Sequence, residues 1–195
     1  MKSSKAKWML CIIVLALIAA VVAPVIAKGP SKPAGKSEIG HVYLHQKDPG
    51  TWAVVEDSRW GKMKYNLSGS TFDFVFNAHG YAVEDEGESY QLIYYPDPWP
   101  GNGLICLGDP NVVEEEPVLD VNGVPTGEFK YNVHIKGSVN TGDLPKATDE
   151  NDPNGAKIWL VPTGDVDCDN NLMTGWTPDD ILFEADLINF DDTDE

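Results

Sequence analysis

Hydrophobic and polar residues alternate with a period of two along most of the chain beyond residue 38. The clearest example is Phe72–Phe76, in which three phenylalanines alternate with Asp73 and Val75 before the turn Asn77–Gly80. Such alternation is typical of strands that bury one face and expose the other. Comparable runs occur at 42–44, 52–55, 63–67, 90–95, 104–107, 129–135, 157–162 and 181–187. The pattern therefore predicts a chain built from short strands.

Two of these runs enclose a stiff loop near the middle of the chain. Residues 96–103, PDPWPGNG, contain three prolines and two glycines, which exclude helix and force a reversal. Ser89–Tyr95 and Leu104–Leu107 are therefore expected to be two core strands, with Cys106 on the second. The number of runs and the turns between them predict an all-β fold, an Ig-like antiparallel β-sandwich of about eight strands.

Two segments depart from simple alternation. Asp109–Thr126 is acidic and rich in turn residues, so we expect a long excursion with a small hairpin of its own at Asn122-Gly123. Thr177–Asp180 has an N-cap residue, a proline and two acids, which could begin a short helix. The alternative is a strand that runs through Ile181–Phe190.

The first 27 residues predict an export segment. Three lysines precede the apolar run Met9–Val22, and the segment ends with the small residue Ala27, as in a signal peptide. An uncleaved membrane anchor is the alternative, because the apolar stretch is about long enough to span a bilayer. The predicted organisation is then a flexible linker at 28–38, the β-sandwich domain at 39–190 and an acidic tail at 191–195.

The chain is strongly acidic, with a formal net charge of −17. Loss of residues 1–27, which carry three lysines and no acids, would change this to −17 − 3 = −20. Such a surface repels nucleic acid and anionic lipid, so we expect no nucleic-acid partner and no membrane insertion beyond the N-terminal segment. A charge of this size also serves simply to keep a protein soluble.

Two cysteines remain outside the export segment, Cys106 and Cys168. An even number of cysteines in an exported protein favours a disulfide. This bond would close a loop of about 60 residues and contribute about 4 kcal/mol in the chain-entropy model. Two unpaired buried thiols are the alternative.

The sharpest candidate for a metal site is the acidic loop at 165–171. Asp165, Asp167 and Asp169 alternate in a way that could direct several oxygens at one calcium ion, and no other cofactor is indicated. The match to a calcium loop is partial, because Asn170 stands where glycine is usual and Trp176 where a bidentate glutamate is usual. The alternative is an ordinary solvated loop of an acidic protein.

Other single residues suggest weaker candidate sites. Trp99, held between prolines, could bind a sugar ring or a partner protein, or it could fold back over the end of the sandwich. Asn66 begins a glycosylation sequon. His41 and His45 share a strand face but lie about 13 Å apart, too far to bind one ion together.

Catalytic signatures are lacking: we find no GxSxG, HExxH or phosphate-binding loop. The runs GHVYLHQKDPGTW, WGKMKYNL, FDFVFNAHG, LIYYPDPWPGNGLICLG and KIWLVP, with GW and LFE downstream, resemble uncharacterised secreted or surface proteins of methanogenic archaea. This resemblance covers most of the chain after the export segment. It implies an exported protein associated with the cell envelope, and it supplies no catalytic residues and no ligand.

These observations predict a secreted or cell-surface protein that is not an enzyme. The leading hypothesis is a β-sandwich module with an adhesion or structural role, stabilised by calcium, whose partner is a cell-envelope protein or glycan. One alternative is a self-associating fibre subunit, in which Ile39–Gln46 or Lys28–Ser37 adds as a strand to a neighbouring chain. Another is a carbohydrate-binding module that uses the Trp99 loop.

Overall fold

The computed structural model describes residues 39–95, 103–140, 142, 144 and 155–192. They belong to one of the chain's two units, Ser37–Glu195. The predicted export segment, the linker at 28–38, the loop with Trp99 and most of the acidic tail lie outside the described residues. Among the residues that are described, no helix is both long and apolar enough to cross a membrane.

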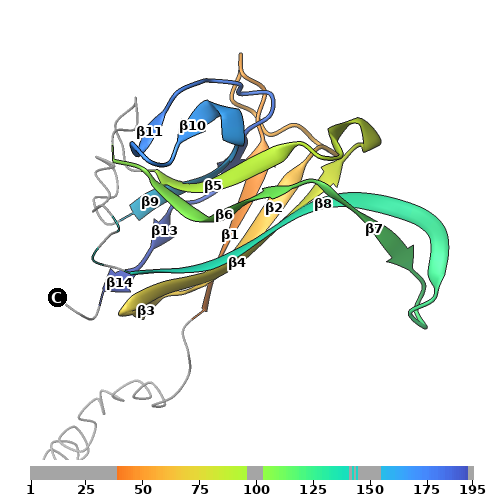
Figure 1. Cartoon of the computed structure of the whole chain (residues 1–195), viewed down its shortest axis with the longest axis horizontal. Helices are drawn as coiled ribbons and strands as arrows, with labels where there is room; N and C mark the ends of the chain where they lie inside the picture. Colours follow the sequence, from red (N-terminus) through yellow and green to blue (C-terminus); the bar gives the residue numbers. More distant parts are fainter. Residues whose placement is uncertain (1–38, 96–102, 141, 143, 145–154, 193–195) are drawn as a thin grey trace, which may run out of the picture. The chain divides into compact units, whose positions relative to one another are not determined.

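The described residues are nearly all β (Figure 1). The large sheet comprises β1 (Ile39–Gln46), β2 (Trp60–Asn66), β4 (Thr71–Tyr81), β5 (Ser89–Tyr95), β6 (Ile105–Val112), β7 (Glu114–Leu119), β8 (Pro125–Asn140), β9 (Gly155–Pro162), β12 (Leu182–Glu184) and β13 (Ile188–Asn189). Two small sheets pair β10 (Val166–Asp167) with β11 (Leu172–Met173), and β14 (Asp191–Asp192) with β3 (Ser68–Gly69). Short 3-10 turns occur at Val83–Asp85 and Thr163–Asp165. The all-β expectation is confirmed.

The main sheet has the strand order β6-β5-β9-β12-β1-β2-β4-β8-β7, with antiparallel neighbours. Alternation along β4 sets one side of it: Phe72, Phe74 and Phe76 are buried, whereas Asp73 and Val75 are exposed. The inward side chains of these strands, β7 excepted, meet in one hydrophobic core enclosed by the curved sheet. Period two therefore determines which face of each strand points inward.

The sheet curves until its ends nearly meet, so that it is almost barrel-shaped. Two glycines allow β6 and β8 to approach. A Cβ on Gly108 would lie 2.9 Å from Ile135 Cγ2, and a Cβ on Gly137 would lie 3.3 Å from the Cα of Gly108. Since side chains at these positions would hold the strands apart, the glycine pair permits near-closure. The strands thus form one curved sheet, and the expected Ig-like sandwich of two packed sheets is not confirmed.

The two unusual segments also differ from simple strands. β7 and the first half of β8 form a hairpin, as expected for the acidic excursion, and Figure 1 shows this hairpin projecting from the rest of the sheet. The segment at Thr177–Asp180 forms a turn, in which Asp180 N donates to Thr177 O at 2.9 Å, and no helix follows. Instead of one strand through Ile181–Phe190, the short strands β12 and β13 follow.

Candidate functional site

Strands β5, β9 and β12 bury side chains on both faces. Their inward residues join the enclosed core, and their outward residues form a second cluster outside it. In that cluster the rings of Tyr95 and Trp159 stack with centroids 4.2 Å apart, and Trp159 meets Phe183 edge to face at 5.2 Å. All three side chains are buried. This explains why 157–162, KIWLVP, is apolar at consecutive positions and not at alternate ones.

Two tryptophans from distant parts of the chain lie on this buried layer. Trp52 comes from the loop between β1 and β2, and its ring meets Phe183 edge to face at 5.4 Å. Trp176 comes from the segment after β11 and lies 6.0 Å from Trp159 and 5.9 Å from Phe183. The two indoles lie 6.4 Å apart with an angle of 47° between their planes. Trp52 is 53% exposed and Trp176 is 42% exposed, so both present ring surface to solvent. We call this pair the tryptophan platform.

A tight loop holds Trp52 in place. Trp52 N donates to Asp48 O at 2.8 Å, and the Asp48 carboxylate accepts hydrogen bonds from the backbone of Gly50 and from Thr51. The bonds from Thr51 lower the pKa of Asp48. The backbone of Trp52 has φ +59°, a left-handed conformation that costs about 1–2 kcal/mol for a residue with a side chain. The loop therefore holds the backbone of Trp52 in a conformation that tryptophan rarely adopts.

Asp165 holds the segment that carries Trp176. Its carboxylate accepts from Thr177 N at 2.9 Å, and its backbone oxygen accepts from Thr174 N at 2.9 Å and Gly175 N at 3.2 Å. Gly175 packs directly against the Asp165 carboxylate, where no side chain would fit. Asp165 therefore acts as the internal cap of this loop.

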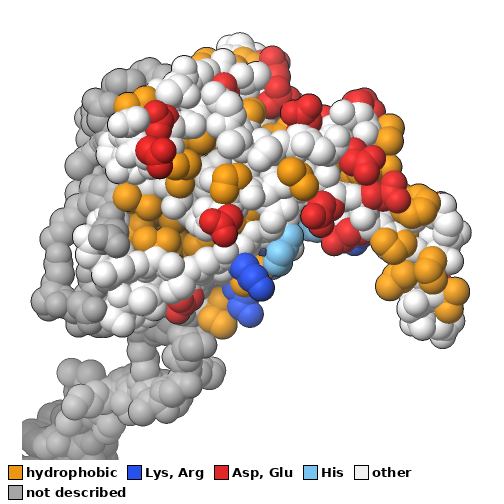
Figure 2. Space-filling view, in the orientation of Figure 1, with side chains coloured by type: hydrophobic (Ala, Val, Ile, Leu, Met, Phe, Trp, Pro, Cys, Tyr) orange, Lys and Arg blue, Asp and Glu red, His pale blue; other side chains and the backbone are white. Residues whose placement is uncertain are grey.

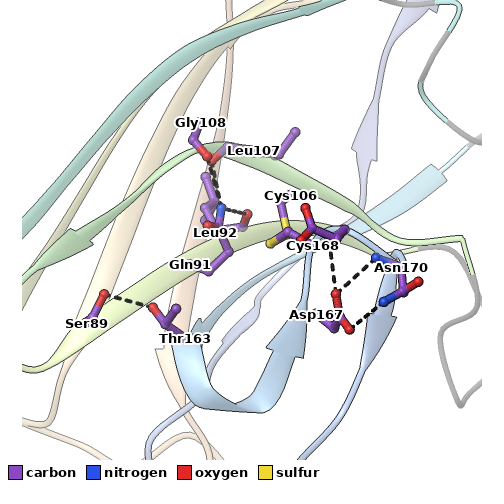
Figure 3. Close-up of a disulfide and its surroundings, with 11 residues drawn as sticks. Ser89, Gln91, Leu92, Cys106, Leu107, Gly108, Thr163, Asp167, Cys168 and Asn170 are labelled. Atoms are coloured by element: carbon purple, nitrogen blue, oxygen red, sulfur yellow. Dashed lines mark hydrogen bonds between the residues drawn. A yellow bond between two sulfur atoms is a disulfide. The ribbon is translucent and has the colours of Figure 1, made fainter.

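A disulfide attaches the same segment to the main sheet. Figure 3 shows the bond between Cys106 of β6 and Cys168. Their Cα atoms lie 5.7 Å apart. This confirms the predicted pair. Beside it, the Asp167 carboxylate accepts from Asp169 N at 3.1 Å and from both nitrogens of Asn170, at 3.0 and 2.7 Å. The disulfide and these turns fix the β10–β11 loop beside the tryptophan platform.

The three predicted calcium ligands are not brought together. The Asp165 carboxylate faces Thr177 and Gly175, whereas that of Asp167 caps its own turn. Among the described residues, no three His, Cys, Asp or Glu side chains are placed to hold one metal ion. The Asp165 and Asp167 carboxylates instead accept hydrogen bonds from the backbone of their own loops.

Charged groups border the platform on the side of β12. Trp159 Nε1 donates to the Glu184 carboxylate, and Lys47 Nζ donates to Glu184 O at 3.0 Å. Lys47 Nζ also lies 5.9 Å from the centroid of the Phe183 ring. Burial raises the pKa of Glu184, against the opposing effects of Lys47, the Trp159 bond and Lys157. The platform therefore has an apolar centre and a polar edge that carries both an acid and a base.

The remaining predicted residues lie elsewhere. Trp99 lies outside the described residues. The Asn66 amide makes three bonds in the turn between β2 and β4, donating to Ser68 O and Thr71 O and accepting from Asp73 N. His41 and His45 lie on β1. The sequence signal for Trp52 is its position after Pro49 and Gly50, which mark a turn and not the strand expected at 52–55.

Comparison with known proteins adds no relative: no family model, no curated protein and no solved structure matches this chain. The resemblance to surface proteins of methanogens therefore stays a prediction.

Proposed function

We propose that this protein is an exported, non-enzymatic binding module that attaches to glycans through Trp52 and Trp176. The observation that carries the proposal is the pair of half-exposed indoles lying on a buried aromatic layer. Ring surface that is fixed before binding loses little conformational entropy when a ligand covers it. The expected adhesion role follows, with a glycan of the cell exterior as the partner.

Sugar rings suit such a surface for a chemical reason. One side of a pyranose presents mainly C–H groups and can pack on an indole, while its hydroxyls point outward to polar groups. Lys47 and Glu184 lie at the edge of the platform, because Lys47 contacts the ring of Phe183 and Glu184 accepts the hydrogen bond from Trp159. Because the two indoles are close and inclined, they can contact neighbouring rings of one oligosaccharide.

Two further features support export and binding at the cell surface. The Cys106–Cys168 disulfide is typical of proteins outside the reducing cytosol. The lysines and apolar run at the N-terminus are typical of an export segment. The competing interpretation of the platform is that Trp52 and Trp176 merely shield Phe183 and Trp159 from water.

The test is binding to a glycan array, followed by calorimetric titration with the glycans that bind. We expect Trp52→Ala and Trp176→Ala each to weaken binding by about tenfold or more, since one stacked ring is worth about 1.4 kcal/mol. The matched control is Trp60→Ala, because Trp60 on β2 is 39% exposed and packs instead against His79. The proposal is contradicted if Trp52→Ala and Trp176→Ala lower stability but leave glycan affinity unchanged. It is also contradicted if Trp60→Ala weakens glycan binding as much as they do.

A further inference from the structure

The outward side chains of β1, β2, β4 and the part of β8 paired with β4 form a cationic face. The strand register arranges them in three rows: His41, Lys64, Val75 and Lys136; Tyr43, Lys62, Asn77 and His134; and His45, Trp60 and His79. All four histidines of the chain lie in these rows. Among the outward positions of these strands in the described structure, Asp73 is the only carboxylate. The sign of the charge is thus reversed locally on a chain of net charge −17.

Exposed hydrophobic side chains are interspersed with the cations of this face. Tyr43, Trp60 and Val75 are each about two-fifths exposed. Lys62 Nζ lies 5.3 Å from the centroid of the Tyr43 ring, and the ring of Trp60 lies 4.8 Å from that of His79. Aromatic side chains among cations are characteristic of protein interfaces more than of ordinary solvated surface.

The second surface is the hairpin of residues 114–131, which we call the arm. Figures 1 and 2 show it standing off the body, with hydrophobic side chains along its outer part. Leu119, Val121, Val124 and Phe129 are all more than half exposed. The tip is well formed, because Asp120 Oδ1 accepts from Asn122 N at 2.8 Å and Val124 N at 2.9 Å. A two-stranded ribbon with this much apolar surface is marginally stable until something covers it.

The charges on the arm complement the cationic face in both sign and spacing. Glu114 and Glu116 lie two residues apart on one side of β7. Lys62 and Lys64 lie two residues apart on the outward side of β2. Both pairs repeat at roughly 7 Å along an extended strand. Within the chain, the Glu116 carboxylate accepts from Asn132 Nδ2 at 2.8 Å and forms an exposed ion pair with Lys130 at 3.5 Å. The exposed ion pair competes only weakly with a lysine of a second copy.

We propose that the arm of one copy docks on the cationic face of a second copy of this chain. Two such acidic copies repel each other over most of their surfaces, so the cationic face is where an acidic arm can approach. The hydrophobic residues at the tip of the arm, Val121 and Val124, then pack on the exposed side chains of Tyr43, Trp60 and Val75 of the neighbour. Arm and face are different surfaces, so the contact is heterologous: it closes into a ring or continues as a filament.

The test is the oligomeric state of the full chain, measured by sedimentation velocity over a range of protein and salt concentrations. A non-ionic detergent masks association through the apolar run Met9–Val22. We expect concentration-dependent association that weakens about tenfold or more from low to high salt. A protein that stays monomeric at low salt up to about 0.1 mM overturns the proposal.

Charge reversal identifies the two surfaces. The face variant Lys62→Glu/Lys64→Glu and the arm variant Glu114→Lys/Glu116→Lys should each associate about tenfold or more weakly. Mixing the two variants should restore association, because each retains the surface that the other has lost. The control Glu56→Lys/Asp169→Lys changes the net charge equally at two exposed positions outside the arm and the cationic face, and circular dichroism checks that every variant folds.

Three outcomes of this series contradict the proposal. The first is a mixture that fails to associate, and the second is a control that weakens association as much as the arm variant does. The third outcome is that the face binds added polyglutamate while the arm variant behaves as the unmodified protein. That result would identify an anionic polymer as the occupant of the cationic face and exclude the arm.

Discussion

Replacing Gly108 by alanine tests the near-closure of the sheet. The added Cβ would lie 2.9 Å from both Ile135 Cγ2 and Lys136 O, which is closer than such atoms normally approach. Overpacking of this kind costs about 1–3 kcal/mol. Gly108 also has φ +69°, where alanine adds about 1–2 kcal/mol of backbone strain. We therefore expect Gly108→Ala to lower the free energy of unfolding by about 2–5 kcal/mol.

Gly87 provides a matched control for the backbone term. It has φ +87°, and nothing lies within 4 Å of where its Cβ would be, so Gly87→Ala should cost only the strain. The difference between the two variants, about 1–3 kcal/mol, then measures the contact between β6 and β8. Urea denaturation gives this difference directly, and thermal unfolding should show a gap of about 2–12 °C. Equal losses in the two variants would refute the apposition of β6 and β8.

Two further predictions concern carboxylates. Because burial raises the pKa of Glu184, the folded state binds its proton more tightly than the unfolded state does. The stability that this proton provides is present below the ordinary pKa of glutamate and is lost as the pH rises through the raised value. Glu184→Gln should therefore gain stability relative to the unmodified protein as the pH rises from about 4 to about 8; urea denaturation at each pH checks this, and a constant difference would contradict it. We also expect the same thermal midpoint in millimolar calcium and in chelator, because the Asp165 and Asp167 carboxylates already accept backbone hydrogen bonds. A clear rise with calcium would show that the loop rearranges to bind it.

Local pattern was sufficient to predict the β class, the central hairpin strands and the arm. Alternation at Phe72–Phe76 identifies an inward face without any knowledge of neighbouring strands. The shape of the sheet could not be found in this way, because it depends on Gly108 and Gly137 lying back to back. Each glycine alone resembles an ordinary turn or bulge residue, and their contact becomes visible only when β6 and β8 are brought together.

Only part of the tryptophan platform could be predicted from the sequence: the need for an outer layer, but not the residues that form it. A strand with alternating hydrophobic and polar residues has one solvent-exposed face, as in β1, β2, β4 and β8. The cationic face lies on the exposed side of these strands. A strand that is apolar at consecutive positions must have both faces covered, so Gln91–Tyr95 and KIWLVP at 157–162 imply an outer layer above β5 and β9. Which loops supply that layer is set by contacts across more than a hundred residues, such as Trp52 with Trp176. The need for a covering layer can therefore be predicted from local sequence. The residues that form this layer, and with them the candidate site, are determined by tertiary contacts.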